Sequence, residues 1–384
     1  MSYGSRFGHG ILVGILLLTP LARAQVTGFS SLELNEEPGR ERLWKGEWKF
    51  EIGGHKFEEG KDQGAAALLY FTGKFEYSFA WWLKARVTPR VDLFTSRVQE
   101  RYDNDTYSNR LRLIEGVISI QPFQEVELNA GAINQRHLDS PMLVSGQRSF
   151  PGLQQVYQRQ FSAFGVELNA QQVVPTSTSL NTEREDEEAL PSFRTESLKL
   201  GGRHFAWFNW KVRAGHFIWS DLPDKIAFES AISGNRVEGE VAPGARFLSG
   251  FEGYFWSGEA CYCGTGLIDF TGEYQGLVNT EAPSEYADAA MLGAGPRFHF
   301  GDIDLDLRYR SYFIERDATV AVYNRSLLGN TNRIGNSVEF NLVFKDRKFA
   351  IVGEWTNART ARNVETQKTM SSWYLGVETE YASF

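Results

Sequence analysis

Three residues with the functional groups of a hydrolase lie together in this 384-residue sequence. His137, Asp139 and Ser140 place an imidazole, a carboxylate and a hydroxyl within "RHLDS", and a histidine can activate a serine as its general base. Asp103 and Asp105 form a second candidate, a carboxylate pair with no histidine nearby in sequence. Because each group comes from one short segment, we expect no catalytic role, and a hydrolase remains the alternative.

Two cysteines, Cys261 and Cys263, introduce thiol chemistry in "EACYCGTG". Two cysteines are too few for a disulfide framework. Residues i and i+2 of a strand lie near the upper distance limit for a disulfide, so a bond between them requires a turn. The sequence around them shows no set of histidine or acidic ligands. We therefore expect two thiols or a local disulfide at the end of a hairpin, with no metal and no cofactor.

The most regular charged pattern in the chain is "DIDLDLRYRSYF", residues 302–313. Charged and apolar side chains alternate there with a period of two, which predicts a strand with one polar and one apolar face. The same alternation recurs in 43–52, 125–132 and 266–276, and about sixteen such segments can be counted, with 135–159 the least clear. The polar face of 302–313 carries Asp304, Asp306, Arg308 and Arg310, and the apolar face carries Ile303, Leu305, Leu307, Tyr309 and Phe313.

Short and long connections take turns between these segments. The short ones include 121–124, the turn near Phe208, 301–302 and 346–348; the long ones are 96–109, 135–150, 175–193, 222–244, 279–287, 317–333 and 362–371. A meander of hairpins with short turns at one end and long loops at the other is typical of a transmembrane β-barrel. Such a sheet must close, because lipid offers no hydrogen bonds to the backbone.

The predicted fold is therefore all-β: a closed, antiparallel, transmembrane meander barrel of about 16 strands, with 14 as the alternative count. Leu305 and Leu307 are expected to face lipid, and the charged side of each strand a polar interior. Aromatic residues make up 14% of the chain and suit the two membrane interfaces. A soluble periplasmic β-sandwich would instead pack Leu305 and Leu307 on a second sheet and leave the aromatic residues at strand ends unexplained.

The first residues have the features of an export signal. Arg6 precedes the apolar run "ILVGILLL", and Ala22–Arg23–Ala24 resembles a cleavage site. We predict a signal peptide over 1–24, a periplasmic leader over 25–41 and the barrel over 42–384. Cleavage would change the net charge from −8 to −10, since 38 basic and 48 acidic residues remain. An acidic chain without a basic cluster is not expected to bind nucleic acid.

The last residues, "SWYLGVETEYASF", are similar to the C-terminal signal of Gram-negative outer-membrane barrels. Tyr374, Gly376, Thr379 and Tyr381 fill the positions of that signal, whereas Phe384 falls out of parity, so the strand is expected to end at Tyr381. Together with the export signal and the hairpins, the chain resembles porin-like outer-membrane proteins, with no single named family. The resemblance implies a location in the outer membrane and contacts with membrane lipid, lipopolysaccharide and the barrel-assembly machinery, and it leaves a homotrimer open.

A barrel of about sixteen strands can enclose water, whereas an eight-stranded one is filled by its own side chains. We predict passive diffusion of small hydrophilic solutes or ions. An envelope enzyme of lipase or protease type, or a structural or adhesive barrel with a blocked lumen, is the alternative. The inward charges could form a transverse field or pair across strands. The predicted pore-lining residues are Lys84, Arg86, Arg90, Arg110, Arg112, Glu125, Glu127, Lys199, Arg203, Lys211, Arg213, Asp269, Glu273, Asp304, Asp306, Arg308, Arg310, Glu378 and Glu380.

Two loops have unusual compositions. The segment 135–158 mixes Met142, Leu143, Val144 and Phe150 with prolines and glycines. By resemblance to the third loop of general porins, it is expected to fold into the barrel mouth and narrow it; an ordinary surface loop followed by an irregular strand is the alternative. The acidic run 183–188 is expected to be a solvated loop, although it could also bind divalent cations at the lipopolysaccharide surface.

Overall fold

The computed structural model describes residues 43–96, 109–175, 190–204, 207–239, 244–264, 266–324 and 326–383. The predicted signal peptide and leader, the carboxylates Asp103 and Asp105, the acidic run 183–188 and Phe384 lie outside these residues. Within them, no helix combines the length and the apolar character needed to span a membrane.

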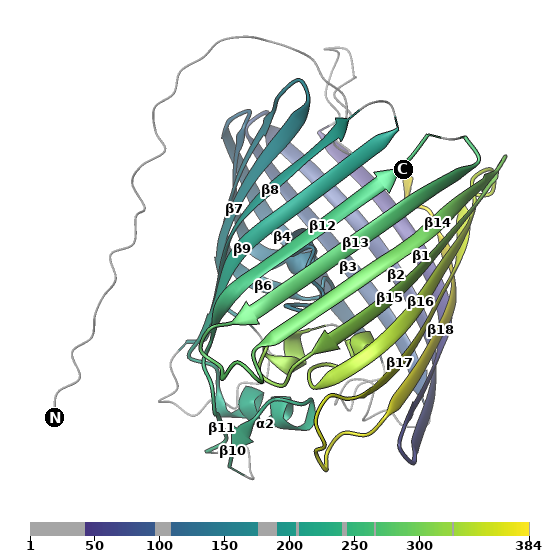
Figure 1. Cartoon of the computed structure of the whole chain (residues 1–384). Coiled ribbons are helices and arrows are strands. Elements are labelled where there is room, and N and C mark those ends of the chain that lie inside the picture. The colour runs from purple at the N-terminus through teal and green to yellow at the C-terminus, as the bar shows by residue number, and fades with distance from the viewer. Residues whose placement is uncertain are drawn as a thin grey trace.

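Sixteen long antiparallel strands close into a barrel (Figure 1), which confirms the predicted fold and strand number. Every strand pairs with its neighbours along the chain, and β1 pairs with β18 through Glu51 opposite Glu378. The barrel strands are β1 (Trp44–Glu59), β2 (Asp62–Ala80), β3 (Leu83–Ser96), β4 (Asn109–Phe123), β5 (Val126–Asn134), β6 (Ser149–Gln160), β7 (Phe164–Val173), β8 (Ser192–His204), β9 (Phe208–Ser220), β12 (Phe251–Tyr262), β13 (Ile268–Asn279), β14 (Asp288–Phe300), β15 (Ile303–Ile314), β16 (Arg333–Phe344), β17 (Phe349–Thr360) and β18 (Met370–Thr379).

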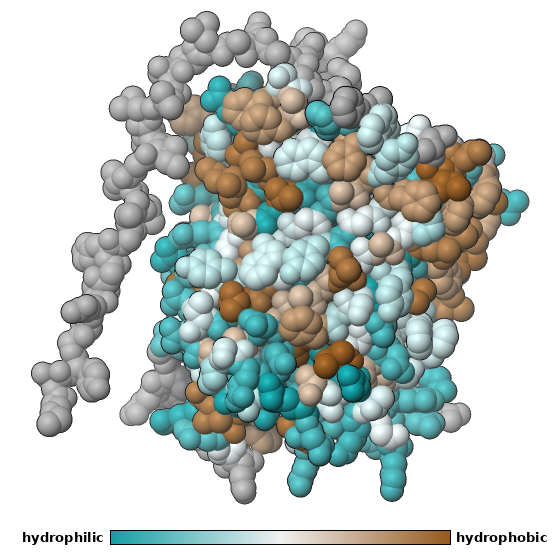
Figure 2. Space-filling model, in the orientation of Figure 1, coloured by the Kyte–Doolittle hydropathy of each residue, from teal (hydrophilic) through white to brown (hydrophobic). Residues whose placement is uncertain are grey.

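The two faces of the sheet separate as the alternation predicts. On β15, Tyr309 and Phe313 are exposed on the outer face, whereas Arg310 between them is buried on the inner face. Aromatic residues such as Trp81 and Phe300 are exposed where strands end. Figure 2 shows apolar side chains over the strands and hydrophilic ones gathered at the end that carries α2 in Figure 1. The outer face therefore suits a hydrocarbon solvent.

The connections divide the barrel into a short-turn end and a long-loop end. The short turns are 81–82, 124–125, 161–163, 205–207, 263–267, 301–302 and 345–348. The long-loop end begins with the tight turn 60–61 and continues with 97–108, 135–148, 174–191, 221–250, 280–287, 315–332 and 361–369. The smaller elements lie in these loops: η1 (Gln135–Leu138), α2 (Asp224–Ile232), β10 (Val237–Glu238), β11 (Arg246–Phe247), η2 (Ala321–Tyr323) and η3 (Ser326–Leu328).

The C-terminal strand ends earlier than the sequence predicts. β18 stops at Thr379, and the separate strand β19 (Ala382–Ser383) pairs with β1. Because the register shifts by one residue, Trp48 lies opposite Ala382 instead of Tyr381. The ring of Tyr381 lies over the ammonium group of Lys74, 3.5 Å from its centroid, and Lys74 follows the inward parity of β2. The predicted end of the strand at Tyr381 is therefore two residues too late.

The separation of the two faces gives a test of the fold. Leu198, exposed on the outer face in the middle of β8, should not tolerate a charge. We expect Leu198→Arg to lower the free energy of unfolding in lipid vesicles by about 2–4 kcal/mol. Thr271→Arg is the matched control, because Thr271 follows the inward parity of β13 between Asp269 and Glu273. If denaturant titrations show the same loss of unfolding free energy for both variants, the faces are assigned wrongly.

Candidate pore constriction

The β5–β6 loop, residues 135–148, folds into the barrel. It begins with η1, where Asn134 Oδ1 accepts a hydrogen bond from the Arg136 N–H at 3.0 Å. Asp139 then reverses the chain with a φ of 52°, a conformation that aspartate tolerates better than most residues. Leu138, Met142 and the two residues that follow Met142 are fully or almost fully buried. The loop behaves as its apolar composition suggests, but it ends at 148, since β6 begins at Ser149.

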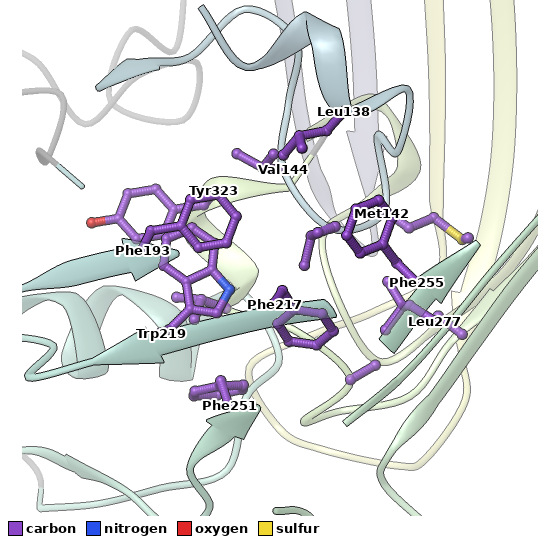
Figure 3. Close-up of a cluster of buried hydrophobic side chains, with 14 of the residues drawn as sticks. Leu138, Met142, Val144, Phe193, Phe217, Trp219, Phe251, Phe255, Leu277 and Tyr323 are labelled. Carbon is purple, nitrogen blue, oxygen red and sulfur yellow. The ribbon is translucent and has the colours of Figure 1, made fainter. Parts of the chain in front are cut away.

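The buried face of this loop belongs to an apolar cluster inside the barrel (Figure 3). Phe193 from β8 stacks on Trp219 from β9 with ring centroids 3.8 Å apart. Tyr323 from the β15–β16 loop stacks on the same Trp219 ring at 4.9 Å. Barrel wall and loops therefore share one apolar core, to which Leu138, Met142, Leu143, Val144, Phe150, Phe217, Phe255, Leu277, Met291 and Tyr312 also belong.

Hydrogen bonds join the β5–β6 loop to the β15–β16 loop. The backbone N–H of Ser145 donates to the Tyr323 carbonyl at 2.7 Å. The Thr319 hydroxyl donates to the Leu143 carbonyl at 3.0 Å, and Arg148 donates to the Val322 carbonyl at 2.6 Å. Thr319 is completely buried. The two loops therefore move as one unit unless these bonds break.

The β9–β12 loop joins them through Asn235, which is almost completely buried. Its amide nitrogen donates to the carbonyls of Arg316, at 2.5 Å, and Thr319, at 2.8 Å. Its Oδ1 accepts from the Ala321 N–H at 2.7 Å. The described parts of these three loops form one layer across the long-loop end, and we call it the loop layer. The sequence predicted that the first of these loops enters the barrel, but it gave 222–244 and 317–333 only as long polar connections, because partners far apart in sequence leave no periodic signal.

A buried arginine fixes the loop layer to the wall. Arg213, with 2% of its side chain exposed, donates to the His137 carbonyl and lies 3.1 Å from Glu167. Nδ1 of His137 lies 2.8 Å from the Asn134 carbonyl, while its buried Nε2 has no partner. Burial lowers the pKa of His137 to about 4, and the neighbouring Arg213 charge acts in the same direction. His137 is therefore neutral at pH 7.

The predicted hydrolase group does not form a catalytic arrangement in the described residues. The hydroxyl of Ser140 is buried and has no hydrogen-bond partner, and His137 uses Nδ1 on a backbone carbonyl instead of a carboxylate. His137 instead borders a cavity of about 220 Å³ inside the barrel. Its other lining residues are mostly polar and include Arg86, Glu115, Glu127, Asn129, Gln154, Gln158, Glu167 and Asn169.

Three arginines of the wall converge on a single carboxylate. Arg90 Nε lies 2.6 Å from Asp92 Oδ1, and Arg110 and Arg112 lie 3.3 and 3.4 Å from Oδ2. Arg112 also donates to the Gln147 carbonyl of the β5–β6 loop at 3.0 Å. These contacts place three guanidinium groups around one carboxylate where the loop layer meets β3 and β4. We call these four charged residues the arginine cluster.

Most other predicted lining residues pair with an opposite charge on the adjacent strand or on the next strand but one. The pairs are Lys84–Glu76 at 3.8 Å, Arg86–Glu127 at 2.9 Å, Lys199–Glu167 at 3.9 Å, Lys211–Glu259 at 3.2 Å, Arg297–Asp306 at 2.6 Å, Arg308–Glu273 at 3.3 Å, Lys49–Glu378 at 2.6 Å, and Arg310 with Glu273 and Glu339. Asp269 and Asp304 contact His299. Pairing between strands therefore describes this wall better than a transverse field does, and in the arginine cluster one carboxylate contacts three guanidinium groups.

Three predicted lining residues lie at the short-turn rim instead. Glu125 is exposed in the turn 124–125, because Phe123 already pairs with Val126. Glu380 is exposed beyond the end of β18, and Arg203 is exposed one residue before β8 ends. The period-two pattern gives the face of a residue but not where its strand stops, and the role of these three residues in lining the pore stays a prediction.

Comparisons with known proteins agree with this geometry. No protein-family model matches the sequence, and no curated protein matches it. Among solved structures, OprB of Pseudomonas putida has a TM-score of 0.57 at 11% identity, covering 89% of this chain and 94% of its own. OccAB1 of Acinetobacter baumannii has 0.52 at 10%, covering 92% and 99%. OmpF of Salmonella typhi, in complex with daunomycin, has 0.52 at 9%, covering 88% and 97%. The chain has the fold of Gram-negative outer-membrane porins, as its C-terminal strand and hairpins predict.

Proposed function

We propose that the protein is a porin-like channel of the Gram-negative outer membrane, through which small hydrophilic solutes or ions diffuse passively. The observation that carries this proposal is the closed sixteen-stranded barrel with charged and polar side chains on its inner wall, which is the fold of outer-membrane porins. The arginine cluster lies on this wall beside the loop layer. Fixed charges at such a place select solutes by the sign of their charge.

The apolar cluster indicates where solutes would pass. Among the described residues, it has members on β4 to β9, β12 to β15, β17 and β18, and Phe57 of β1 packs against it. On β16, Arg333 ties the layer to the wall by donating to the Gly329 carbonyl at 3.0 Å. β2 and β3 contribute no member. Tyr70 and Arg90 lie on these two strands, with the guanidinium 3.6 Å from the ring centroid, so we place the pathway along them.

Two further properties belong to this proposal. We expect no hydrolase activity, because His137 and Ser140 lack the hydrogen bond that would activate a nucleophile. A homotrimer is a reasonable assembly, since OmpT of Vibrio cholerae, with a TM-score of 0.50 at 10% identity, has a trimer form and this chain has a similar fold. A structural barrel with a blocked lumen is the second candidate, favoured by the extent of the loop layer.

Single-channel recording in planar bilayers tests the channel. We expect stable current steps whose anion-to-cation permeability ratio depends on the arginine cluster, because charged side chains in a constriction select ions by sign. Arg110→Ala or Arg112→Ala should reduce the anion-to-cation permeability ratio several-fold, and Asp92→Asn should increase it. Arg194→Ala is the control: Arg194 is exposed on the outer face and pairs with Glu196, so its loss should leave the ratio unchanged.

Two results would count against the proposal. A folded wild-type protein that gives no current would favour the blocked barrel. The variants at Asp92, Arg110 and Arg112 could also conduct with an unchanged anion-to-cation permeability ratio. In that case the arginine cluster does not lie on the pathway.

The pKa of His137 predicts a response to acid. Its pKa is about 4 in the folded loop and about 6.5 when exposed. The loop conformation therefore keeps its full stability above pH 6.5 and loses about 3 kcal/mol as the pH falls to 4. We expect the wild-type channel to fluctuate between conductance levels in this range. In His137→Gln, which cannot gain a proton, the fluctuation should be absent; equal acid responses in both proteins would contradict the assignment.

A further inference from the structure

The hairpin of β12 and β13 brings metal-binding groups together at the short-turn end. The sulfurs of Cys261 and Cys263 and a carboxylate oxygen of Asp269 all lie within 4.8 Å of one another. The cysteines are joined by a disulfide, with Cα atoms 5.4 Å apart. A local disulfide was one of the two sequence expectations. We expected no acidic ligand at the cysteines, because the chain has to reverse before Asp269 faces them.

Neighbouring residues hold the Asp269 carboxylate in place. Its Oδ1 accepts a hydrogen bond from the Gly264 N–H at 3.0 Å. Its Oδ2 lies 3.0 Å from His299 Nε2, and His299 Nδ1 lies 2.8 Å from Asp304. Lys345 pairs with Asp304 at 2.7 Å. Carboxylates that bind metals are usually held in this way by hydrogen bonds from outer-shell residues.

We propose that Cys261, Cys263 and Asp269 bind a divalent metal of the zinc type when the disulfide is reduced, and that the disulfide is the metal-free oxidised form of this site. Two thiolates and one carboxylate are ligands that Zn²⁺ accepts, with a fourth position for water. Soft thiolates also select against Mg²⁺ and Ca²⁺, which prefer oxygen. The site lies apart from the arginine cluster and does not depend on the channel proposal.

The redox step is an exchange with an external dithiol. The disulfide takes two electrons and two protons from the dithiol, which becomes a disulfide itself. The two thiols then release two protons as the metal binds, because only thiolates are ligands. Oxidation reverses the sequence and expels the metal. Both cysteines are partly exposed, so a small reductant and a metal ion can reach them.

Cobalt binding in detergent micelles tests the site, because thiolate-bound Co²⁺ has a charge-transfer absorption that carboxylate-bound Co²⁺ lacks. After reduction with a phosphine, the wild-type protein should bind one Co²⁺ with this absorption, and Zn²⁺ should displace it. The oxidised protein and the double variant Cys261→Ser, Cys263→Ser should lack the band. Asp269→Asn should weaken binding about 10- to 100-fold, an effect of the size found when a group in a metal site is removed.

Asp306→Asn is the matched control, because Asp306 has the same inward parity on β15 but pairs with Arg297; its Co²⁺ affinity should equal that of the wild type. Heat-modifiable electrophoretic migration checks that each variant is folded. A second measurement needs no variant: Zn²⁺ should slow maleimide alkylation of the two reduced cysteines. Reduced wild-type protein without the band and without this protection would overturn the proposal, as would an Asp269→Asn affinity equal to that of the wild type.

Discussion

The structure depends on one constraint: in lipid, each backbone N–H and C=O must find its partner within the protein. The sheet meets this constraint by closing through β1 and β18, over nine consecutive residue pairs from Glu51–Glu378 to Glu59–Met370. Closure then fixes which face of every strand meets lipid. Because the outer face has to be apolar, the polar and charged residues that alternate with it are directed into the lumen.

Those charges then have to be compensated inside the barrel. Many find an opposite charge on a neighbouring strand, as Lys199 does with Glu167 and Lys211 with Glu259. In the arginine cluster, the Asp92 carboxylate contacts three guanidinium groups. It lies on β3 and β4, and among the described residues β2 and β3 add none to the apolar cluster. The pathway that we propose for a hydrated solute runs along this side of the barrel.

Much of this could be read from the amino acids. The alternation around Arg308 and Arg310 identified the strand and its two faces. The apolar residues Met142, Leu143 and Val144 indicated a loop that is buried away from solvent. The partners of that loop could not be read. Asn235 and Asp317 lie in segments that look like ordinary polar loops, yet both are buried; Asp317 pairs with Arg236 at 2.6 Å. The same holds for His299 and Asp269, which are distant in sequence and in contact across two strands.

The sequence by itself determined the closed sheet and the direction of its side chains, because a period of two is a local property and lipid permits few solutions. Only the tertiary structure decided where each strand ends, as Glu125, Tyr381 and Glu380 show, and which loops share a core. Strand ends depend on register against a neighbour, and loop contacts depend on residues more than a hundred positions apart, as Thr319 and Leu143 are. Strand ends and loop contacts leave no periodic pattern in the sequence, so both are known only from the structure of the closed barrel.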